Sequence, residues 1–455
     1  MKNFALNQND IYTVEEFQND FVIQAQTYYI DVYGCQMNVA ESQGLSGILE
    51  EAGWIKATDK SQADLLIFYT CCIRESAEDR VYGNIGAAKA YKKAKPSMII
   101  ALGGCMAQKK ETTAKVQKSY SHVDIIFGTA HPYKILDYIA QKEQTKSMVL
   151  ALSGKRDMDI AMPTLHDSTV SAKVNIMNGC DKFCTFCIVP HVRGREVSRN
   201  FDSIVAECEQ LLKNEFKEIT LIGQNVNSYK YENYNFADLI QTIGDLPYKF
   251  RLKFTSPHPQ DITQQVIDVV ANNPNLAKII HLPLQAGADR ILQKMNRTYT
   301  RERFMKIVHD IRTACKDCSI STDIMVGFPT ETEEDFLDTL DIVERAKFNN
   351  IYSFVYSKRS GTPAARMEGQ ISPTVKRDRI TRLIQSQSLI GNQHALDVVG
   401  REYEVLCVAH DGNKALCRTI CDRLVLLKHT DIAVGEFGFI KVVESKNSNL
   451  VGSLI

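Results

Sequence analysis

The sequence predicts an α/β protein made of an N-terminal parallel α/β domain, a partial (β/α)6 TIM-like barrel and a small C-terminal antiparallel β barrel. From Tyr28 onward, short apolar runs such as ADLLIFYT and MIIALGG alternate with segments of helical periodicity, as in parallel sheets with crossover helices. Six further strand-then-helix repeats follow a polar break. The last sixty residues instead alternate as short strands, which is typical of a small closed barrel.

These patterns place the boundaries. We expect a polar leader at residues 1–26, the first domain at 27–145, a linker at 146–165, the barrel core at 166–395 and the final barrel at 396–455. The strands of the core are expected at VNIM, EITLIGQ, RLKFTSPHP, KIIHLPLQ, ISTDIMVGFP and IYSFVYS. In such a barrel the site lies at the carboxyl ends of the strands.

The charge balance, apolar content and cysteine count of the chain limit the classes of protein to which it can belong. The chain has 455 residues, 44% of them hydrophobic, and Lys plus Arg balances Asp plus Glu at 54 each, so nucleic-acid contacts would depend on local basic clusters. The N-terminus lacks an apolar signal region, and no run of about 18 apolar residues could span a bilayer. We therefore expect a cytoplasmic protein without a membrane partner. Thirteen cysteines in such a chain favour metal or redox chemistry over disulfides.

The stretch GCDKFCTFC places Cys180, Cys184 and Cys187 within eight positions, directly after a predicted strand. A [4Fe–4S] cluster normally takes four thiolates, so three would leave one iron open to a small molecule. The alternative is a zinc site completed by His191 or Cys208. Zinc ribbons sit on hairpins, however, and Cys208 falls in the helical run IVAECEQLL.

A second set of three cysteines occurs in the first domain, where Cys35, Cys71 and Cys105 each follow a predicted strand. The carboxyl ends of parallel strands meet at one edge, so these thiols can converge on a second cluster. A single cysteine of this kind would more often be a buried core residue. Neighbouring residues point apart, so we assign Cys71 as the ligand and Cys72 to packing.

The motifs YGCQMN, TCCIRE, GGCMAQ, GCDKFCTFCIVPHVRGREVSR, GQNVNSY, HLPLQAGADRIL and DIMVGFPTETEEDF together resemble the methylthiotransferase family of radical S-adenosylmethionine (SAM) enzymes. The resemblance covers residue 28 to the C-terminus. It implies two [4Fe–4S] clusters, SAM as cofactor and a C-terminal RNA-binding TRAM domain. It is closest to the branch that adds a methylthio group to carbon 2 of N(6)-isopentenyladenosine at position 37 of tRNA. Three positions depart from the family pattern: Tyr69, His191 and Thr330.

The resemblance also implies which residues contact the cofactor. Candidates follow the predicted strands or lie between the ligand cysteines: Phe186, Gln224, Asn225, Ser256, His258, Gln285 and Asp323. Each could instead cap a helix or fix a loop, and His258 lies between two prolines. No catalytic residue is expected beyond the cluster ligands.

Arginines are the candidates for tRNA contact. Arg193, Arg195 and Arg199 form a basic stretch after GCDKFCTFC, which could meet tRNA phosphates or neutralise the charge of the cofactor and cluster, and Arg418 and Arg423 lie in the final barrel. A solvated surface is the alternative. Residues 392–455 as a whole are not basic, with seven Lys and Arg against eight Asp and Glu.

The remaining cysteines, which are Cys315, Cys318, Cys407, Cys417 and Cys421, are interpreted as structural. The family chemistry implies the tRNA anticodon loop as partner, an electron donor such as flavodoxin or ferredoxin, and a sulfur source. Two alternatives remain: methylthiolation of threonylcarbamoyl-adenosine or a ribosomal-protein aspartate, or a non-catalytic zinc-stabilised RNA-binding protein.

Overall fold

The computed structural model describes residues 26–72, 75–154, 156–158, 160, 162–428, 430–446 and 449–455. The predicted leader therefore lies almost wholly outside the described residues. The chain forms two compact units. The first comprises residues up to Asp167 together with Asn178–Asp181 and Ile188–Asn200, and the second comprises Ser168–Met177, Lys182–Cys187 and Phe201–Ile455.

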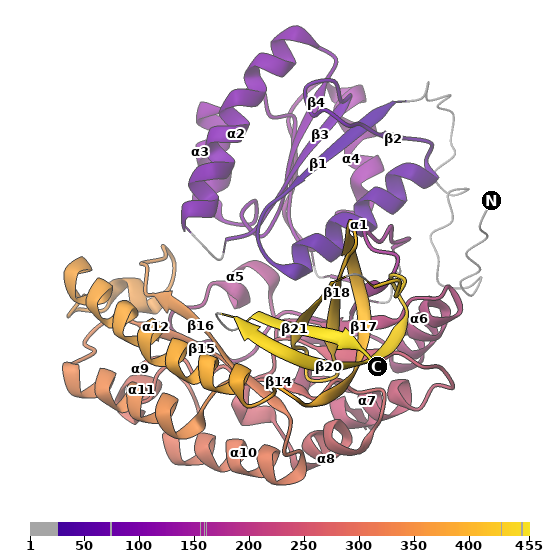
Figure 1. Ribbon diagram of the computed structural model, residues 1–455. Helices are drawn as coiled ribbons and strands as arrows, with labels where there is room; N and C mark the ends of the chain where they lie inside the picture. Colours follow the sequence, from indigo (N-terminus) through magenta and orange to yellow (C-terminus); the bar gives the residue numbers. More distant parts are fainter. Residues whose placement is uncertain are drawn as a thin grey trace. The chain divides into compact units, whose positions relative to one another are not determined.

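A six-stranded parallel sheet forms the centre of the first unit, in the order β2-β1-β3-β4-β5-β6 (Figure 1). Its strands are β1 (Thr27–Val32), β2 (Ile55–Lys56), β3 (Leu65–Thr70), β4 (Ile99–Gly104), β5 (Ile125–Phe127) and β6 (Val149–Ala151). Both β3 and β4 are buried along their whole length, as expected for parallel strands that are covered on both faces.

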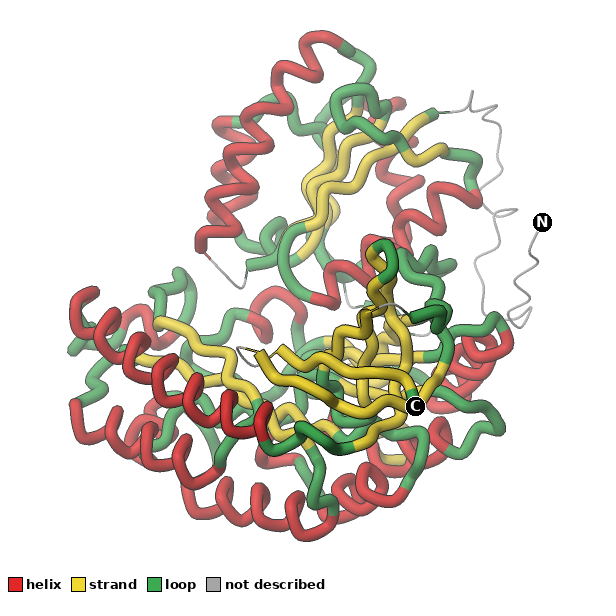
Figure 2. Tube along the Cα trace, viewed as in Figure 1, coloured by secondary structure: helices red, strands yellow, loops and turns green. Residues whose placement is uncertain are grey.

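Four helices cover this sheet: α1 (Gln36–Glu51), α2 (Glu75–Ala94), α3 (Lys110–Ser119) and α4 (Ile135–Thr145). Alternate residues of β3 point to opposite faces. Ile67 packs in one apolar cluster with α1 and α4, whereas Phe68 packs in the other with α2 and α3. Figure 2 shows the resulting helix, strand and helix layers. The single tryptophan, Trp54, is 3% exposed in the first of these clusters.

A segment that follows the GCDKFCTFC motif in sequence also belongs to this unit. It contains α5 (Val189–Arg193) and β9 (Val197–Ser198). Ile188 and Val192 pack against Cys72 and Cys105, and the Thr129 hydroxyl donates to the Val192 carbonyl at 2.8 Å. The first unit is therefore built from three separate stretches of the chain, which the sequence pattern did not reveal.

In the second unit six parallel strands follow one another in chain order, as the sequence predicts. They are β7 (Ser171–Asn175), β10 (Glu218–Ile222), β13 (Arg251–Phe254), β14 (Ile279–His281), β15 (Ser319–Val326) and β16 (Asn350–Val355). They form two three-stranded sheets, β13-β10-β7 and β14-β15-β16, which a parallel bridge between Leu252 and Leu276 brings together. This arrangement confirms the partial (β/α)6 barrel.

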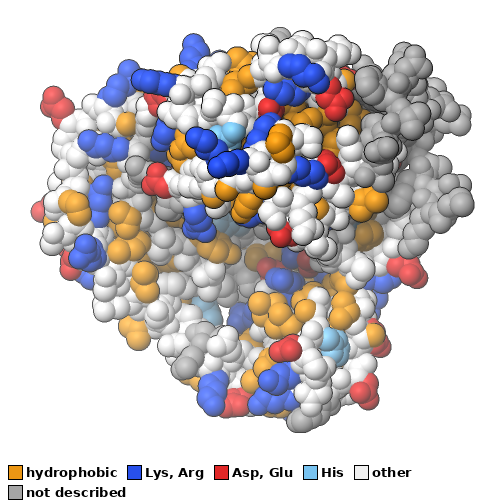
Figure 3. Space-filling view, turned by 90° about the horizontal axis from the view of Figure 1, so that it is seen from above, with side chains coloured by type: hydrophobic (Ala, Val, Ile, Leu, Met, Phe, Trp, Pro, Cys, Tyr) orange, Lys and Arg blue, Asp and Glu red, His pale blue; other side chains and the backbone are white. Residues whose placement is uncertain are grey.

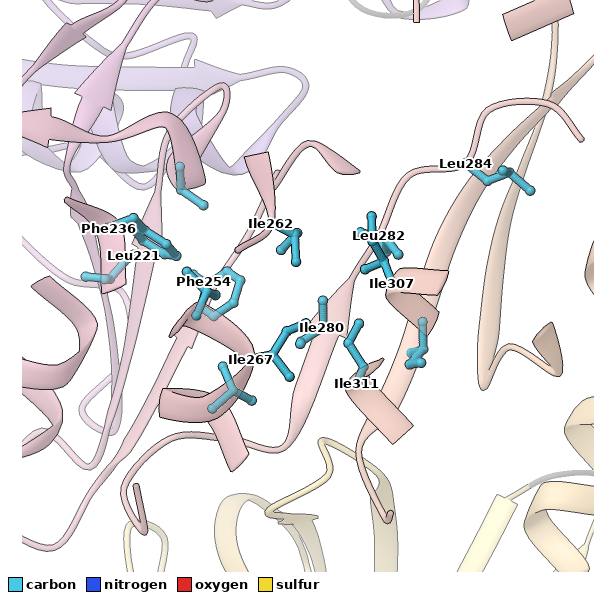
Figure 4. Close-up of a cluster of buried hydrophobic side chains, with 14 of the residues drawn as sticks. Leu221, Phe236, Phe254, Ile262, Ile267, Ile280, Leu282, Leu284, Ile307 and Ile311 are labelled. Carbon is cyan, nitrogen blue, oxygen red and sulfur yellow. The ribbon is translucent and has the colours of Figure 1, made fainter. Parts of the chain in front are cut away.

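Helices cover the outside of this barrel: α6 (Phe201–Lys213), α7 (Phe236–Gly244), α8 (Gln264–Asn272), α9 (Asp289–Lys294), α10 (Arg301–Ala314), α11 (Glu333–Ala346) and α12 (Pro373–Leu396). Local sequence fixes several of their starts, because Asn235 and Thr332 each form a capping box with the Asp three residues later. Figure 4 shows strand residues such as Leu221 and Ile280 packed with helix residues such as Ile267 and Ile311.

The C-terminal residues form a closed five-stranded barrel in the order β17-β18-β19-β21-β20. Its strands are β17 (Glu402–Asp411), β18 (Lys414–Thr419), β19 (Leu424–Lys428), β20 (Phe437–Lys446) and β21 (Asn449–Leu454). The predicted barrel is confirmed, but it is not wholly antiparallel because β19 and β21 pair in parallel. Cys407 and Cys417 are buried in its core, as predicted.

Ion pairs attach this small barrel to the amino ends of the core strands. Arg251, the first residue of β13, pairs with Glu404 at 2.7 Å, and Lys253 pairs with Asp422 at 3.1 Å. The Lys278 amide donates to the Ile420 carbonyl at 2.8 Å. The small barrel therefore contacts the core at the amino ends of its strands. The expected site lies at the other ends, the carboxyl ends.

Among the described residues no helix has the length and apolar character needed to cross a membrane. Lys and Arg side chains are interspersed with acidic and hydrophobic ones over the described part of the face seen in Figure 3. This mixture is consistent with the balanced total charge.

Candidate active site with two cysteine groups

The first cysteine group lies at the carboxyl ends of three neighbouring strands of the first unit. Cys35 caps the start of α1 just after β1, Cys71 directly follows β3, and Cys105 directly follows β4. The side chains of Cys35 and Cys71 are hydrogen-bonded to each other. The sheet thus gathers the predicted ligands at one edge, as strand order alone suggested.

Glycines permit this close approach. Gly34 has φ +114°, and a Cβ on it would lie 2.1 Å from Cys71 Cβ. Gly104 has φ +91°, and a Cβ there would lie 2.5 Å from the Thr70 carbonyl oxygen. No other residue type fits either position without moving a cysteine-bearing loop.

The environment of these thiols favours thiolate. The hydrogen bond with Cys71 is the largest cause that lowers the pKa of Cys35 to about 6; burial opposes it and the charge of Arg193 adds to it. The pKa of Cys105 is likewise lowered, first by a hydrogen bond with Cys72. Cys72 is buried beside Cys105, and its hydrogen bond with Cys105 is the largest cause that raises its own pKa, so its assignment to packing stays a prediction. Thiolates are the ligands that hold iron–sulfur clusters, so the chemistry of these donors fits one. Among the described residues no group of three His, Cys, Asp or Glu side chains is arranged to hold a metal ion, so the ligand set stays a prediction.

A buried polar network lies beneath this group. Arg193 donates from Nε to Cys105 Sγ at 3.1 Å and from Nη1 and Nη2 to the two carboxylate oxygens of Glu41 at 2.9 and 2.8 Å. Glu41 also accepts from Arg156 and from the Tyr69 hydroxyl, the latter at 2.9 Å. Burial raises the pKa of Glu41, but the charges of Arg193 and Arg156 outweigh it and hold that pKa at about 2.

The GCDKFCTFC motif is divided between the two units. Cys184 and Cys187 lie in residues 182–187 of the second unit, and Cys180 lies in residues 178–181 of the first. The Cys187 amide donates to the Cys184 carbonyl at 2.9 Å, which forms a tight turn. Thr185 fixes this turn to the end of α9, because its amide and hydroxyl donate to the carbonyls of Met295 and Lys294 at 3.0 and 2.9 Å.

Arg297 holds the sulfur of Cys184. Its Nη1 donates to Cys184 Sγ at 3.3 Å, its Nε to the Tyr299 hydroxyl at 3.0 Å and its Nη2 to the Pro283 carbonyl at 2.9 Å. The guanidinium is buried. No sequence signal pointed to this residue, since it follows a short helix and lies 113 positions from its cysteine.

His258 is a buried neutral imidazole in the second unit. Burial, Arg297 and Lys182 lower its pKa to about 2. Its Nδ1 accepts from the Gln260 amide at 3.2 Å, so Nε2 carries the proton. Nε2 is buried and has no hydrogen-bond partner among the described residues. A donor left in this way is suited to an oxygen of a bound ligand.

Two further predicted contact residues have strained backbones. Ser256 follows β13 with φ +60°, and Gln285 follows β14 with φ +71°. The backbone of Gln285 is held on both sides: its amide donates to the Asp323 carbonyl at 2.8 Å and its carbonyl accepts from the Met325 amide at 2.9 Å. Strain of this kind is concentrated at binding sites.

The other predicted contact residues lie in the same unit. Asn225 follows β10 and donates to Asp261, which pairs with Lys182 of the cysteine loop at 2.7 Å. Gln224 immediately precedes Asn225, and Phe186 packs against the core from between Cys184 and Cys187. Asp323 lies within β15 and not at its end, and its carboxylate is 3.5 Å from His281 Nε2.

Comparison with known proteins connects these features. Residues 27–128 match the family described as "Uncharacterized protein family UPF0004", and residues 174–343 match the radical SAM superfamily. The chain is 40% identical over 435 residues to the tRNA-2-methylthio-N(6)-dimethylallyladenosine synthase of Thermoanaerobacter pseudethanolicus, which covers 94% of this chain and 92% of the relative. It is 39% identical over 460 residues to the synthase of that name from Clostridium botulinum strain Langeland, which covers both chains completely.

The chain belongs to the methylthiotransferase family of radical SAM enzymes. Solved structures agree on the fold alone. The radical SAM methyltransferase TsrM from Kitasatospora setae, bound to cobalamin and a [4Fe–4S] cluster, matches with a TM-score of 0.56 and 14% identity, covering 75% of this chain and 74% of that one. The cobalamin-dependent radical SAM enzyme OxsB matches with a TM-score of 0.52 and 12% identity, covering 80% and 56%.

The three residues that depart from the methylthiotransferase pattern lie in different environments. Tyr69 is fully buried and belongs to the Glu41 network, and His191 is exposed on α5. Thr330 has φ +68°, a left-handed conformation that glycine adopts freely and threonine does not. The glycine usual in the family at this position would therefore remove strain.

The predicted RNA-contacting arginines differ in exposure. Arg195 is on the surface with 72% of its side chain exposed, whereas the side chain of Arg193 is 2% exposed and is held by Glu41. Arg418 pairs with Asp422 at 2.9 Å, and Arg423 donates to the His394 carbonyl at 3.1 Å. These two therefore make contacts within the second unit.

Proposed function

We propose that this protein adds a methylthio group to carbon 2 of N(6)-isopentenyladenosine at position 37 of tRNA. The observation that carries the proposal is the 39–40% identity, over almost the whole chain, to synthases named for this product. That identity covers both cysteine groups and the C-terminal barrel.

The six predicted cysteines divide into two ligand sets. Cys35, Cys71 and Cys105 would hold an auxiliary [4Fe–4S] cluster, and the cysteines of the GCDKFCTFC motif would hold the radical SAM cluster. When bound, the clusters and SAM supply the sulfur, the methyl group and the radical that removes the hydrogen from carbon 2. Three thiolates per cluster leave one iron available to an external ligand, which explains why each set contains three cysteines and not four.

The residues of the second unit would bind the cofactor without taking part in proton transfer. A neutral His258 offers Nε2–H to an oxygen, and Gln285 and Ser256 are pre-positioned by their strained backbones. Because the pKa of His258 is lowered to about 2, the ring stays neutral throughout the physiological range, with its one proton on Nε2.

The partners follow from this chemistry. A flavodoxin or ferredoxin would supply electrons, a separate sulfur source would restore the auxiliary cluster, and the reaction would take place in the cytoplasm. Among the predicted arginines, Arg195 is the better candidate for tRNA phosphates, since 72% of its side chain is exposed, against 2% for Arg193 and 26% for Arg418. Single-stranded loops allow a base to be turned out of its stack, which suits an anticodon-loop substrate.

Two cysteine variants test which cysteine set serves SAM cleavage and which serves methylthio transfer. In anaerobically reconstituted protein, Cys184→Ala should abolish cleavage of SAM, whereas Cys105→Ala should retain cleavage and lose methylthio product. If the Cys105→Ala protein made product at the normal yield, the two-cluster assignment would be wrong. Parallel reactions with tRNA carrying threonylcarbamoyl-adenosine, and with ribosomal protein, distinguish the alternative substrates. A colourless protein that holds zinc and no iron would point to the non-catalytic alternative.

A further inference from the structure

Each cysteine group has one buried arginine hydrogen-bonded to a ligand sulfur. In the first unit Arg193 donates to Cys105 Sγ at 3.1 Å, and in the second unit Arg297 donates to Cys184 Sγ at 3.3 Å. Both arginines are buried, with 8% of each residue exposed when backbone and side chain are counted together. The two sites are built from unrelated elements, so the shared contact is not a consequence of one local motif.

The charge of Arg297 lacks a carboxylate partner in the described part of the chain. Its other two hydrogen bonds go to neutral groups, the Tyr299 hydroxyl and the Pro283 carbonyl. A buried charge is costly unless an opposite charge lies close to it. Among the described residues, the contact of Arg297 that can carry negative charge is the Cys184 sulfur, when it ligates a cluster.

The first cysteine group also has more buried positive than negative charge, although a carboxylate is present there. Arg193 and Arg156 both pair with Glu41, so two positive charges meet one carboxylate. One positive charge is left over, and the remaining contact of Arg193 Nε is the sulfur of Cys105. Each cysteine group therefore has one buried positive charge that the carboxylates bonded to its arginine do not offset.

We propose that Arg193 and Arg297 are positioning residues that each orient one ligand sulfur and raise the reduction potential of its cluster. This inference rests on the proposed function, because it assumes a cluster in each cysteine group. Reduction adds one negative charge to a cluster. A nearby cation and an N–H···S hydrogen bond stabilise the reduced form more than the oxidised form, which makes the potential more positive.

The test measures midpoint potentials in full-length, anaerobically reconstituted protein without tRNA. Replacing Cys180, Cys184 and Cys187 together with Ala leaves only the auxiliary cluster, and replacing Cys35, Cys71 and Cys105 leaves only the radical SAM cluster. Redox titration followed by electron paramagnetic resonance then reports one cluster at a time.

In these backgrounds Arg193→Met should shift the auxiliary potential to more negative values, and Arg297→Met should do the same to the radical SAM potential. Lys variants at both positions keep the charge but cannot reproduce the planar set of donors, so their shifts should be smaller. Arg301→Met is the matched control. Arg301 pairs with Asp338 and Asp341 at 2.5 and 2.6 Å, and its loss should leave the radical SAM potential unchanged.

The inference is overturned if cluster-loaded Met variants have wild-type potentials. Where a Met variant does not hold iron, the Lys variant decides: a negative shift supports the proposal, and an unchanged potential overturns it. The parent proteins separate this result from the proposed function. If neither cysteine background binds a [4Fe–4S] cluster, the proposed function fails, whereas unchanged potentials in loaded variants remove only the role of the arginines.

Discussion

Replacing Glu41 with Gln should destabilise the first unit, because it leaves two buried arginines without their shared carboxylate. The pKa of Glu41 falls from its ordinary value of 4.5 to about 2 in the folded protein. Each pKa unit corresponds to about 1.4 kcal/mol, so the ionised carboxylate contributes about 3 kcal/mol to the free energy of unfolding. Loss of one partner of a buried ion pair costs a similar amount, roughly 3–5 kcal/mol.

The contribution depends on pH in a defined direction. A carboxyl group with a lowered folded-state pKa stabilises fully above its unfolded value of 4.5 and loses this effect as the pH falls through the folded value of about 2. The difference between wild type and Glu41→Gln should therefore shrink from about 3 kcal/mol at pH 7 to about 2 kcal/mol at pH 3.5.

Urea unfolding followed by tryptophan fluorescence measures this difference. Trp54 is the only tryptophan and is buried in the first unit, so its emission reports on that unit alone. Metal-free protein avoids quenching by a cluster. Glu51→Gln, an exposed position at the end of the same helix, is the control and should change stability by no more than about 0.5 kcal/mol. A loss below about 1 kcal/mol for Glu41→Gln, or a loss that does not vary with pH, would refute the reasoning.

Three further changes follow from the second unit, with stability measured by far-ultraviolet circular dichroism in urea. Thr330→Gly should raise stability by up to about 1 kcal/mol, because relief of the left-handed strain, about 1–2 kcal/mol, exceeds the entropy cost of glycine; a lower urea midpoint would contradict this. Glu331→Gln should cost about 3 kcal/mol, since it removes the buried carboxylate that pairs with Arg379 at 2.7 Å and leaves only the half-exposed Glu333 at 3.5 Å, whereas the exposed control Glu334→Gln should cost no more than about 0.5 kcal/mol; equal losses would count against this expectation. Buried neutral His258 disfavours folding in acid, because a lowered folded-state pKa makes the unfolded state bind the proton first; between pH 6.5 and 4.5 wild type should lose about 2 kcal/mol more than His258→Gln, and parallel pH profiles would contradict the role of burial.

The elements that sequence predicted well are those with a local signal. The six core strands and the cysteines at strand ends were readable because apolar runs and helical periodicity recur in order along the chain. Cys35, Cys71 and Cys105 could be brought together from strand order alone, because neighbouring parallel strands end at one edge of the sheet.

Contacts between distant parts of the chain could not be predicted in this way. Arg193 was expected to meet tRNA phosphates or to neutralise the cofactor and cluster, but its pairing with Glu41, 152 positions earlier in the sequence, was not foreseen. Glu41 itself sits inside a helix where an acidic residue is usually exposed. Such pairs carry no periodic signal, and only packing of the segment after the cysteine motif onto the first unit reveals them.

Backbone conformation was also only partly readable. Thr330 was recognised as a departure from the family glycine, but its left-handed φ is visible only in the structure. The parallel pairing of β19 with β21 was missed for a related reason, since alternation identifies a strand without fixing the direction of its partner.

Mass spectrometry of tRNA nucleosides tests the central claim most directly. The protein would be produced in a bacterial host that makes N(6)-isopentenyladenosine but lacks its own methylthiotransferase. We expect the methylthiolated nucleoside to accumulate with the wild-type protein and to be absent with Cys184→Ala and with Cys105→Ala. Unmodified N(6)-isopentenyladenosine in cells that contain the iron-loaded wild-type protein would contradict the account.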